Sequence, residues 1–228
     1  MPFARNVPLM EAKDVENREL AGRREPRWSV IIAIIAVGGL YLALPPSLTF
    51  GPQWVQLAIA VLLLIPSLIT HHRGNLRVNI FLGHLIGIVL TAFMLWSLIL
   101  LVKALPARKE PPATLMRSAA ALWVTNVLVF AQWYWRLDAG GPHGRDQRKG
   151  HTEGAFLFPQ MTLKHDPQAQ RWSPRFIDYL FLAFNTSTAL SPTDTPVLSR
   201  WAKAMAMTQA TISLTIVVIL VGRAVNIM

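Results

Sequence analysis

The chain of 228 residues contains no cysteine, and several other signatures of common protein chemistry are missing as well. Without cysteine there are no disulfides, no thiolate metal ligands and no cysteine nucleophiles. Phosphate-binding glycine loops, the Gly-x-Ser-x-Gly nucleophile turn and histidine pairs at metal-binding spacing do not occur either. We therefore expect no catalytic residue, no metal and no cofactor, and we interpret the protein as not being an enzyme.

Charge is also scarce, and its distribution predicts the fold class. Only 15% of residues are charged and 53% are hydrophobic, with a mean hydropathy of +0.38, whereas soluble domains carry about 25% charged residues. Val78–Val102 is a run of 25 residues without a formal charge, long enough to cross a bilayer. The sequence thus predicts an all-α, polytopic membrane helical bundle with five full spans plus one short spanning or re-entrant helix. These helices are expected at 28–46, 54–71, 78–103, 115–136, 175–191 and 200–226.

The net charge of +10 is better explained by membrane topology than by nucleic acid, because no DNA- or RNA-binding motif accompanies the basic residues. Lys and Arg favour the cytoplasmic side of a membrane. A cytoplasmic N-terminus places 15 of the 22 Lys and Arg on that side, and the reverse orientation is far worse. We predict a multi-pass protein of the cell (inner) membrane with the lipid bilayer as its partner. Its expected regions are a cytoplasmic tail (1–27), a four-span region (28–137), a polar cytoplasmic loop (138–174) and a C-terminal pore-like helical hairpin (175–228).

The polar loop is rich in glycine and charge, which is typical of mostly irregular structure. Its apolar insert "AFLFP", residues 155–159, is expected to dock on the membrane surface or on a helix end. Three histidines in the loop lack the spacing of metal ligands.

Ionisable residues inside membrane spans are candidates for function because their burial is costly. His84 lies between Gly83 and Gly87, a small-xxx-small pair that permits close helix approach. It could serve a proton relay, but a neutral imidazole hydrogen-bonded at a helix interface is the commoner outcome. Asp178 is the one acid placed within or beside the predicted spans, so no carboxylate pair for acid–base chemistry is predicted.

The stretch "FLAFNTSTALSPTDTP", residues 181–196, begins as an apolar helix and turns polar before the last predicted span. Such a pattern is typical of a pore loop or of a capped turn between two ordinary spans. On the last helix a threonine stripe could line an aqueous path, or could pack with its hydroxyls bonded to carbonyls four residues earlier. The candidate residues for a polar path are Asn185, Thr186, Ser187, Thr188, Asp194, Thr208, Thr211 and Thr215.

This C-terminal region resembles the pore domain of the potassium-channel superfamily, with Phe184, Thr186, Thr188 and Asp194 on matching positions. The whole chain is similar to an uncharacterised bacterial family of multi-pass membrane proteins with four N-terminal spans, a polar loop and the same ending. The resemblance implies a pore helix followed by an inner helix. The filter itself is degenerate, because residues 189–193 contain no glycine, so we do not expect potassium selectivity.

Two routes are open to residues 175–191. The 17 residues from Pro174 to Leu190 reach about 25 Å as a helix, which is barely a span. We favour a plain span over a helix that re-enters from the cytoplasmic face.

Two functional hypotheses follow. The first is a pore or channel-like passage for a small ion or solute. The alternative is a structural or accessory membrane protein that binds a partner through the loop 138–174. A homo-oligomer or a membrane-protein partner is compatible with either.

Overall fold

The computed structural model describes residues 25, 27–107, 110–147, 154–163, 172–188 and 195–225. It is an all-α helical bundle, as predicted from the charge-free runs, and within those residues the only β-type pairing is one bridge between Phe156 and Val197. Four helices are long and apolar enough to cross a membrane. The chain therefore belongs to the general class of helical membrane proteins.

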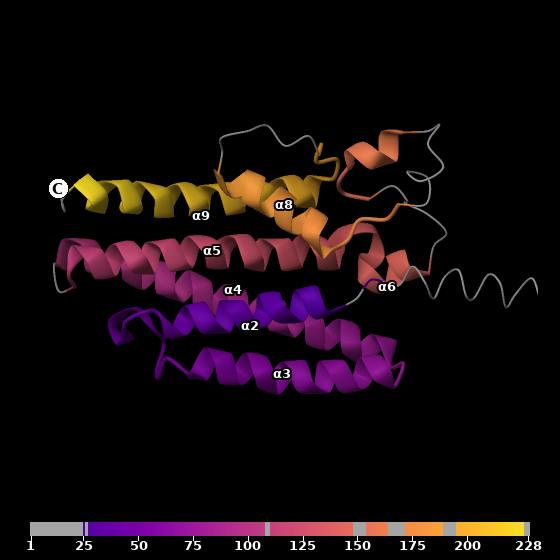
Figure 1. The fold of residues 1–228 in the computed structure, drawn as a ribbon, viewed down its shortest axis with the longest axis horizontal. Coiled ribbons are helices and arrows are strands. Elements are labelled where there is room, and N and C mark those ends of the chain that lie inside the picture. The colour runs from indigo at the N-terminus through magenta and orange to yellow at the C-terminus, as the bar shows by residue number, and fades with distance from the viewer. Residues whose placement is uncertain are drawn as a thin grey trace, which may run out of the picture.

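The helices run back and forth along one axis (Figure 1). α2 (Trp28–Leu42) leads through the 3-10 turn η1 (Pro46–Leu48) to α3 (Val55–His72), and α4 (Leu76–Ala107) is followed by α5 (Pro112–Leu137). The loop contains η2 (Asp138–Gly140), α6 (Gly141–Asp146) and η3 (Pro159–Thr162). α8 (Phe176–Thr188) and α9 (Arg200–Val225) complete the described helices.

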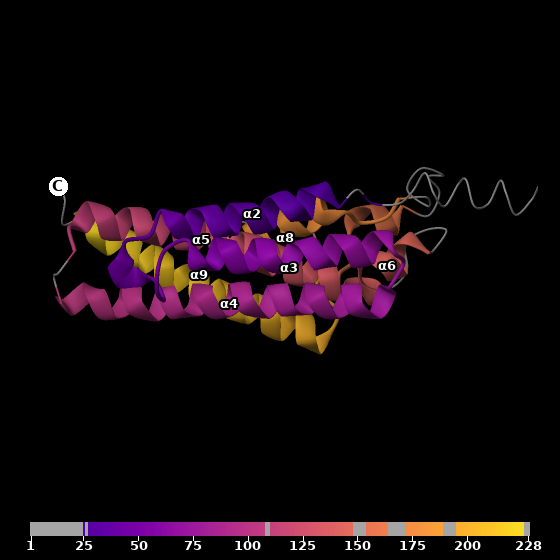
Figure 2. The same cartoon turned by 90° about the horizontal axis from the view of Figure 1, so that it is seen from below.

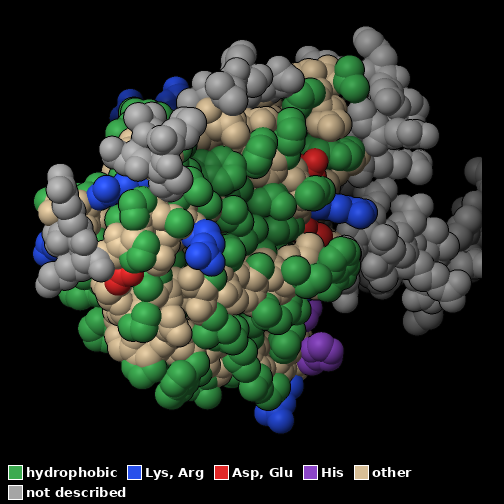
Figure 3. All heavy atoms as spheres, turned by 60° about the vertical axis from the view of Figure 1, so that its left-hand side comes forward, with side chains coloured by type: hydrophobic (Ala, Val, Ile, Leu, Met, Phe, Trp, Pro, Cys, Tyr) green, Lys and Arg blue, Asp and Glu red, His purple; other side chains and the backbone are tan. Residues whose placement is uncertain are grey.

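α5 is the central helix of the bundle. Figures 1 and 2 show α8 and α9 on one side of it and α2, α3 and α4 on the other. Half of its apolar stretch is buried, whereas the corresponding stretch of α3 is only 17% buried. The outer helices expose large apolar side chains such as Leu62, Phe81 and Met207, each at least 65% exposed. Hydrophobic side chains make up most of the coloured surface in Figure 3, as expected of a protein surrounded by lipid.

Glycine lets α4 approach α5 closely, as the Gly83 and Gly87 spacing predicts. A Cβ on Gly83 would lie 1.6 Å from Nη1 of Arg136, and one on Gly87 would lie 2.9 Å from Cζ2 of Trp133. The indole of Trp133 also donates a hydrogen bond to Thr91 Oγ1 at 2.9 Å. The small residues thus make room for two large side chains of α5.

The described part of the loop is more ordered than its composition predicts. Three consecutive residues with positive φ, Ala139, Gly140 and Gly141, turn the chain at the end of α5 into the short helix α6. The apolar insert docks on helix ends, as expected: Phe156 is 1% exposed and its ring contacts the rings of Tyr134 and Trp201.

The position of α8 differs from the plain span that we favoured. α8 starts beside the end of α5, where the Phe176 ring contacts that of Trp135. The chain is back at this same end by Val197, which pairs with Phe156 just before α9 begins. α8 therefore reaches only part of the way along the bundle, and α8 and α9 start from the same end.

Candidate functional site

The inner end of α8 is fixed to α9 by buried polar side chains. Gln209 Nε2 donates to the carbonyl of Ala183 at 2.7 Å and to Ser187 Oγ at 2.8 Å. Ser213 Oγ donates to the carbonyl of Ser187 at 2.6 Å. Gln209 and Ser213 lie nine and thirteen residues after the start of α9, which is about 14–20 Å along its axis. The last turn of α8 therefore sits near the middle of the bundle.

The same glutamine joins the hairpin to the central helix. Tyr134 donates its hydroxyl hydrogen to Gln209 Oε1 at 2.6 Å, and Asn126 Nδ2 donates to the carbonyl of Gln209 at 3.3 Å. Tyr134, Asn126 and Gln209 are fully buried. The junction of α5, α8 and α9 is thus packed with hydrogen-bonded side chains and closed to solvent.

The structure separates the polar-path candidates into two groups. Ser187 points into the buried junction, and Asn185, Thr186 and Thr188 are half-buried. Thr186 and Thr188 donate to carbonyls of their own helix, those of Leu182 and Asn185. Asp194 lies outside the described residues.

The threonine stripe of α9 belongs to the second group and faces outward. All three threonines are exposed, and each hydroxyl donates to the carbonyl four residues earlier at 2.9 Å. Ser187, in contrast, is only 3% exposed. The stripe consists of Thr208, Thr211 and Thr215.

The two ionisable candidates are held by local contacts. Nδ1 of His84 lies 2.8 Å from the carbonyl of Ile80 in its own helix, and its ring centroid is 6.1 Å from that of Trp133. Asp178 Oδ2 accepts a hydrogen bond from the backbone N–H of Arg175 at 2.7 Å. Asp178 therefore caps the start of α8, where a carboxylate also interacts favourably with the helix dipole.

A buried ionic cluster at the end of α5 was not predicted from the sequence. Asp138 is fully buried, which corrects the inference that Asp178 is the one acid in or beside the spans. Its carboxylate accepts hydrogen bonds from the Tyr179 hydroxyl and from the Ala155 backbone N–H, both at 2.6 Å. Arg145 donates to the carbonyls of Trp135 and Asp138, both at 2.9 Å. The cluster fixes the loop and α8 to the end of α5.

Glu25 extends this cluster to the segment before α2. Its carboxylate accepts hydrogen bonds from Trp135 Nε1, at 2.7 Å, and from the backbone N–H of Phe176, and it lies 3.8 Å from Nη2 of Arg145. Burial raises the pKa of Glu25 above its ordinary value, and the hydrogen bonds and Arg145 act in the opposite direction. No local motif marks Glu25 or Asp138, because their partners lie 17 to 151 residues away in sequence.

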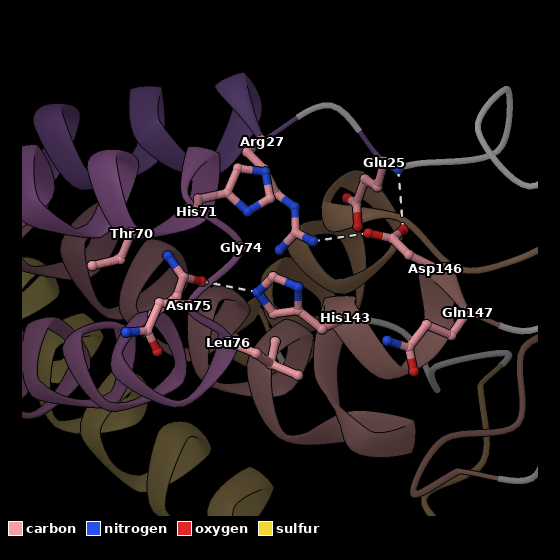
Figure 4. A pocket seen from close by; sticks show the side chains of 11 residues that line it. Glu25, Arg27, Thr70, His71, Gly74, Asn75, Leu76, His143, Asp146 and Gln147 are labelled. Atoms are coloured by element: carbon pink, nitrogen blue, oxygen red, sulfur yellow. Dashed lines mark hydrogen bonds and ion pairs between the residues drawn. The ribbon is translucent and has the colours of Figure 1, made fainter.

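A polar cavity of about 540 Å³ opens at this same end of the molecule, on the α3 and α4 side of α5 (Figure 4). It lies between the α3–α4 turn, α6 and the segment before α2, and Arg27, His71 and His143 are among its walls. In the part of the chain that the structure describes, no group of three or more His, Cys, Asp or Glu could hold a metal ion.

The structure thus defines a helical membrane bundle with a half-length helix packed inside it. No family model, curated protein or solved structure matches the chain. The resemblance to the potassium-channel pore domain stays a prediction from the sequence.

Proposed function

We propose that this protein is an integral protein of the cell (inner) membrane that forms a channel-like passage for a small ion or solute, without potassium selectivity. The observation that carries the proposal is the course of α8, which starts at one end of the bundle, ends near its middle and is followed by a return to the same end. In a bilayer this is a re-entrant helix, and α2, α3, α4, α5 and α9 are the five spans.

A helix that ends inside a membrane is a costly arrangement. Its last carbonyl groups lack partners in the helix, and lipid offers none. Such ends are found where protein covers them or where they border water, as in channels and transporters. The carbonyl end of a helix also carries a partial negative charge, which favours a cation.

The distribution of basic residues supports a cytoplasmic location for the end at which α8 starts. Arg200 and Lys203 lie at the same end of the bundle as Arg175, because α9 begins there. Adding them to the cytoplasmic side raises its share from 15 to 17 of the 22 Lys and Arg. Arg223, at the other end of α9, donates to the carbonyl of Leu105. The proposal accordingly places the C-terminus on the outer side of the membrane.

The proposed path runs between copies of the chain rather than through one copy. The junction of α5, α8 and α9 is closed by Gln209 and its partners, whereas the threonine stripe of α9 is exposed. Hydroxyl-bearing faces are common where membrane helices associate. In the proposed homo-oligomer the stripes of several copies surround a common axis, and their hydroxyls line an aqueous passage.

Cysteine labelling tests this path directly, since the chain has no native cysteine. Thr211→Cys is expected to react with a membrane-impermeant thiol reagent in liposomes and to lower ion flux after labelling. Leu62→Cys is the matched control: Leu62 is 69% exposed near the middle of α3, on a different helix, and is expected to face lipid and to stay unlabelled. Equal labelling of both positions, or no flux of any small cation, anion or neutral solute through the reconstituted protein, would contradict the proposal.

The alternative, an accessory protein that binds a partner through the loop 138–174, receives less support. Asp138, Arg145 and Phe156 of this loop are buried against the bundle. They hold the loop in place and are not available to a partner. Deletion of 140–170 is therefore expected to destabilise the bundle, whereas loss of a co-purifying partner from an intact bundle would favour the accessory role.

A further inference from the structure

Arg136, in the last turn of α5, carries a charge that no described carboxylate neutralises. Its side chain lies between helices: Nη1 is against Gly83 of α4, and Cζ is 5.6 Å from the centre of the Trp135 ring. Nε is buried and has no hydrogen-bond partner among the described residues. The ion pairs found in this region belong to Arg27 and Arg145.

An arginine without a counter-charge is costly inside a membrane protein. The guanidinium cannot release its proton, and an uncompensated charge within the bundle is destabilising. The Trp135 ring offsets only part of this cost, because Arg27 and Arg145 lie over the same ring. Arg27, although paired with Asp146, also acts on Arg136 as a second positive charge. The surroundings of Arg136 therefore favour an anion.

Arg136 borders a small internal cavity that offers room for such an ion. This inner cavity has a volume of about 50 Å³ and lies between α2, α3, α4 and α5, on the opposite side of α5 from α8 and α9 (Figures 1 and 2). A cavity of this size holds a few water molecules or one monatomic anion. None of the described residues that line it is acidic. It adjoins the larger polar cavity of Figure 4, because Arg27, His71 and Asn79 line both, which places an entrance for ions next to it.

The hydroxyl of Ser67, on α3, provides a second donor in the wall of the inner cavity. Nδ2 of Asn79 lies 3.3 Å from Ser67 Oγ and donates to it, and the same Nδ2 donates to the carbonyl of Ser67 at 2.6 Å. A hydroxyl that accepts a hydrogen bond still has its own hydrogen to donate. Much of the remaining wall is apolar, as at Ile34, Leu64 and Ile86. In such surroundings the attraction between Arg136 and an anion is stronger than in water.

We propose that the inner cavity binds a small monovalent anion of the halide class, held by the guanidinium of Arg136 and the hydroxyl of Ser67. The anion neutralises the charge of Arg136 and connects α3 to α5. The site is separate from the proposed passage along α9, so either proposal can fail without the other.

Thermal unfolding of the full chain in a neutral detergent provides the assay, because a ligand of the folded state raises the unfolding midpoint. Sodium chloride is compared with sodium gluconate at equal ionic strength, since gluconate has the same charge as chloride but is far larger than the cavity. We expect chloride to raise the midpoint and the rise to saturate with concentration. General salt effects on the protein surface do not saturate in this way and act on every variant alike. Equal midpoints in the two salts would mean that water alone solvates Arg136, and they would overturn the proposal.

Variants connect the chloride effect to the inner cavity. Arg136→Gln keeps a polar side chain but removes the charge, and it is expected to abolish the difference between chloride and gluconate. Ser67→Ala provides a second, milder test that stays informative if Arg136→Gln does not fold, and it is expected to weaken chloride binding about tenfold, the effect of losing one hydrogen bond to an ion.

Arg117→Gln is the matched control, because Arg117 is exposed at the other end of the same helix. This variant should keep the full difference between the two salts. The proposal is overturned if Arg136→Gln or Ser67→Ala binds chloride as tightly as the wild type, or if Arg117→Gln loses the chloride effect.

Discussion

Replacement of Gln209 by leucine is the sharpest test of how α8 is held in the bundle. The side chain of Gln209 makes three hydrogen bonds, to the carbonyl of Ala183, to Ser187 Oγ and from the Tyr134 hydroxyl. Leucine has a similar volume and leaves only a small cavity, so the loss is mainly one of hydrogen bonding.

The expected loss of stability can be estimated in two ways. Hydrogen bonds between membrane helices contribute about 0.6 kcal/mol on average and about 1.7 kcal/mol at most. Three such bonds give about 2 kcal/mol. Leaving a fully buried polar group without a partner costs about 1–3 kcal/mol, and Gln209→Leu orphans the Tyr134 hydroxyl. Because this hydroxyl is fully buried at the junction, we expect the second effect to dominate and the loss to reach about 3 kcal/mol.

A double-mutant cycle with Tyr134→Phe separates the two effects. The free energy of unfolding is measured by reversible denaturation in mixed micelles for both single variants and the double variant. Tyr134→Phe in the Gln209→Leu background removes the orphaned hydroxyl and is expected to recover about 1 kcal/mol. Thr211→Val is the control, because its hydroxyl is exposed and bonds only its own helix. A Gln209→Leu variant as stable as the wild type, or a coupling free energy near zero, would refute the reasoning.

Three further predictions concern the ends of the bundle and the α4–α5 contact. Burial raises the pKa of Glu25, so the folded state holds the Glu25 proton more tightly than the unfolded state does, and the free energy of unfolding should fall as pH rises from about 4.5 through the raised pKa. Glu25→Gln should flatten this slope when denaturation is measured at several pH values. An unchanged slope would contradict the raised pKa. Gly87→Ala should lower the free energy of unfolding by about 1–3 kcal/mol, because the new Cβ would clash with the rigid Trp133 indole. Gly39→Ala is the control in the same denaturation experiment: a Cβ there has nothing within 4 Å, so the change should be neutral or stabilising. Single cysteines at Ser199 and Glu110 should be labelled from opposite sides of the membrane. Labelling of both from the same side would instead indicate that α8 is a plain span.

The helix positions were predictable because membrane spans are limited by physics that a single sequence displays. A span needs about 20 residues without charge, and charges and prolines mark where it ends. Residues 54–71 and 115–136 were predicted, and α3 covers Val55–His72 while α5 covers Pro112–Leu137. The docking of Phe156 followed from the same reasoning, since an apolar insert in a polar loop has to be covered.

The course of α8 was not predictable from local signals. A 17-residue segment fits both a tilted span and a half-length helix, and nothing within it distinguishes them. Whether α8 is a span or a half-length helix depends on the contact of Ser187 with Gln209 and on the pairing of Phe156 with Val197. These contacts join residues 22 and 41 positions apart in the sequence. The basic pair Arg200 and Lys203 was the one available signal, because a plain span places it on the outer side, where positive charge is disfavoured.

Both ends of α8 are held by buried polar groups of other segments, and this limits how a passage could open. At its start the Phe176 N–H donates to Glu25 and the Tyr179 hydroxyl donates to Asp138, and at its end Ser187 is bonded to Gln209 and Ser213. Tilting α8 away from α5 and α9 would leave several of these groups unpaired, at about 1–3 kcal/mol each. In the proposed homo-oligomer, the passage therefore depends on how copies of α9 meet around a fixed hairpin. If the proposal is correct, substitutions in the threonine stripe should change flux without changing stability.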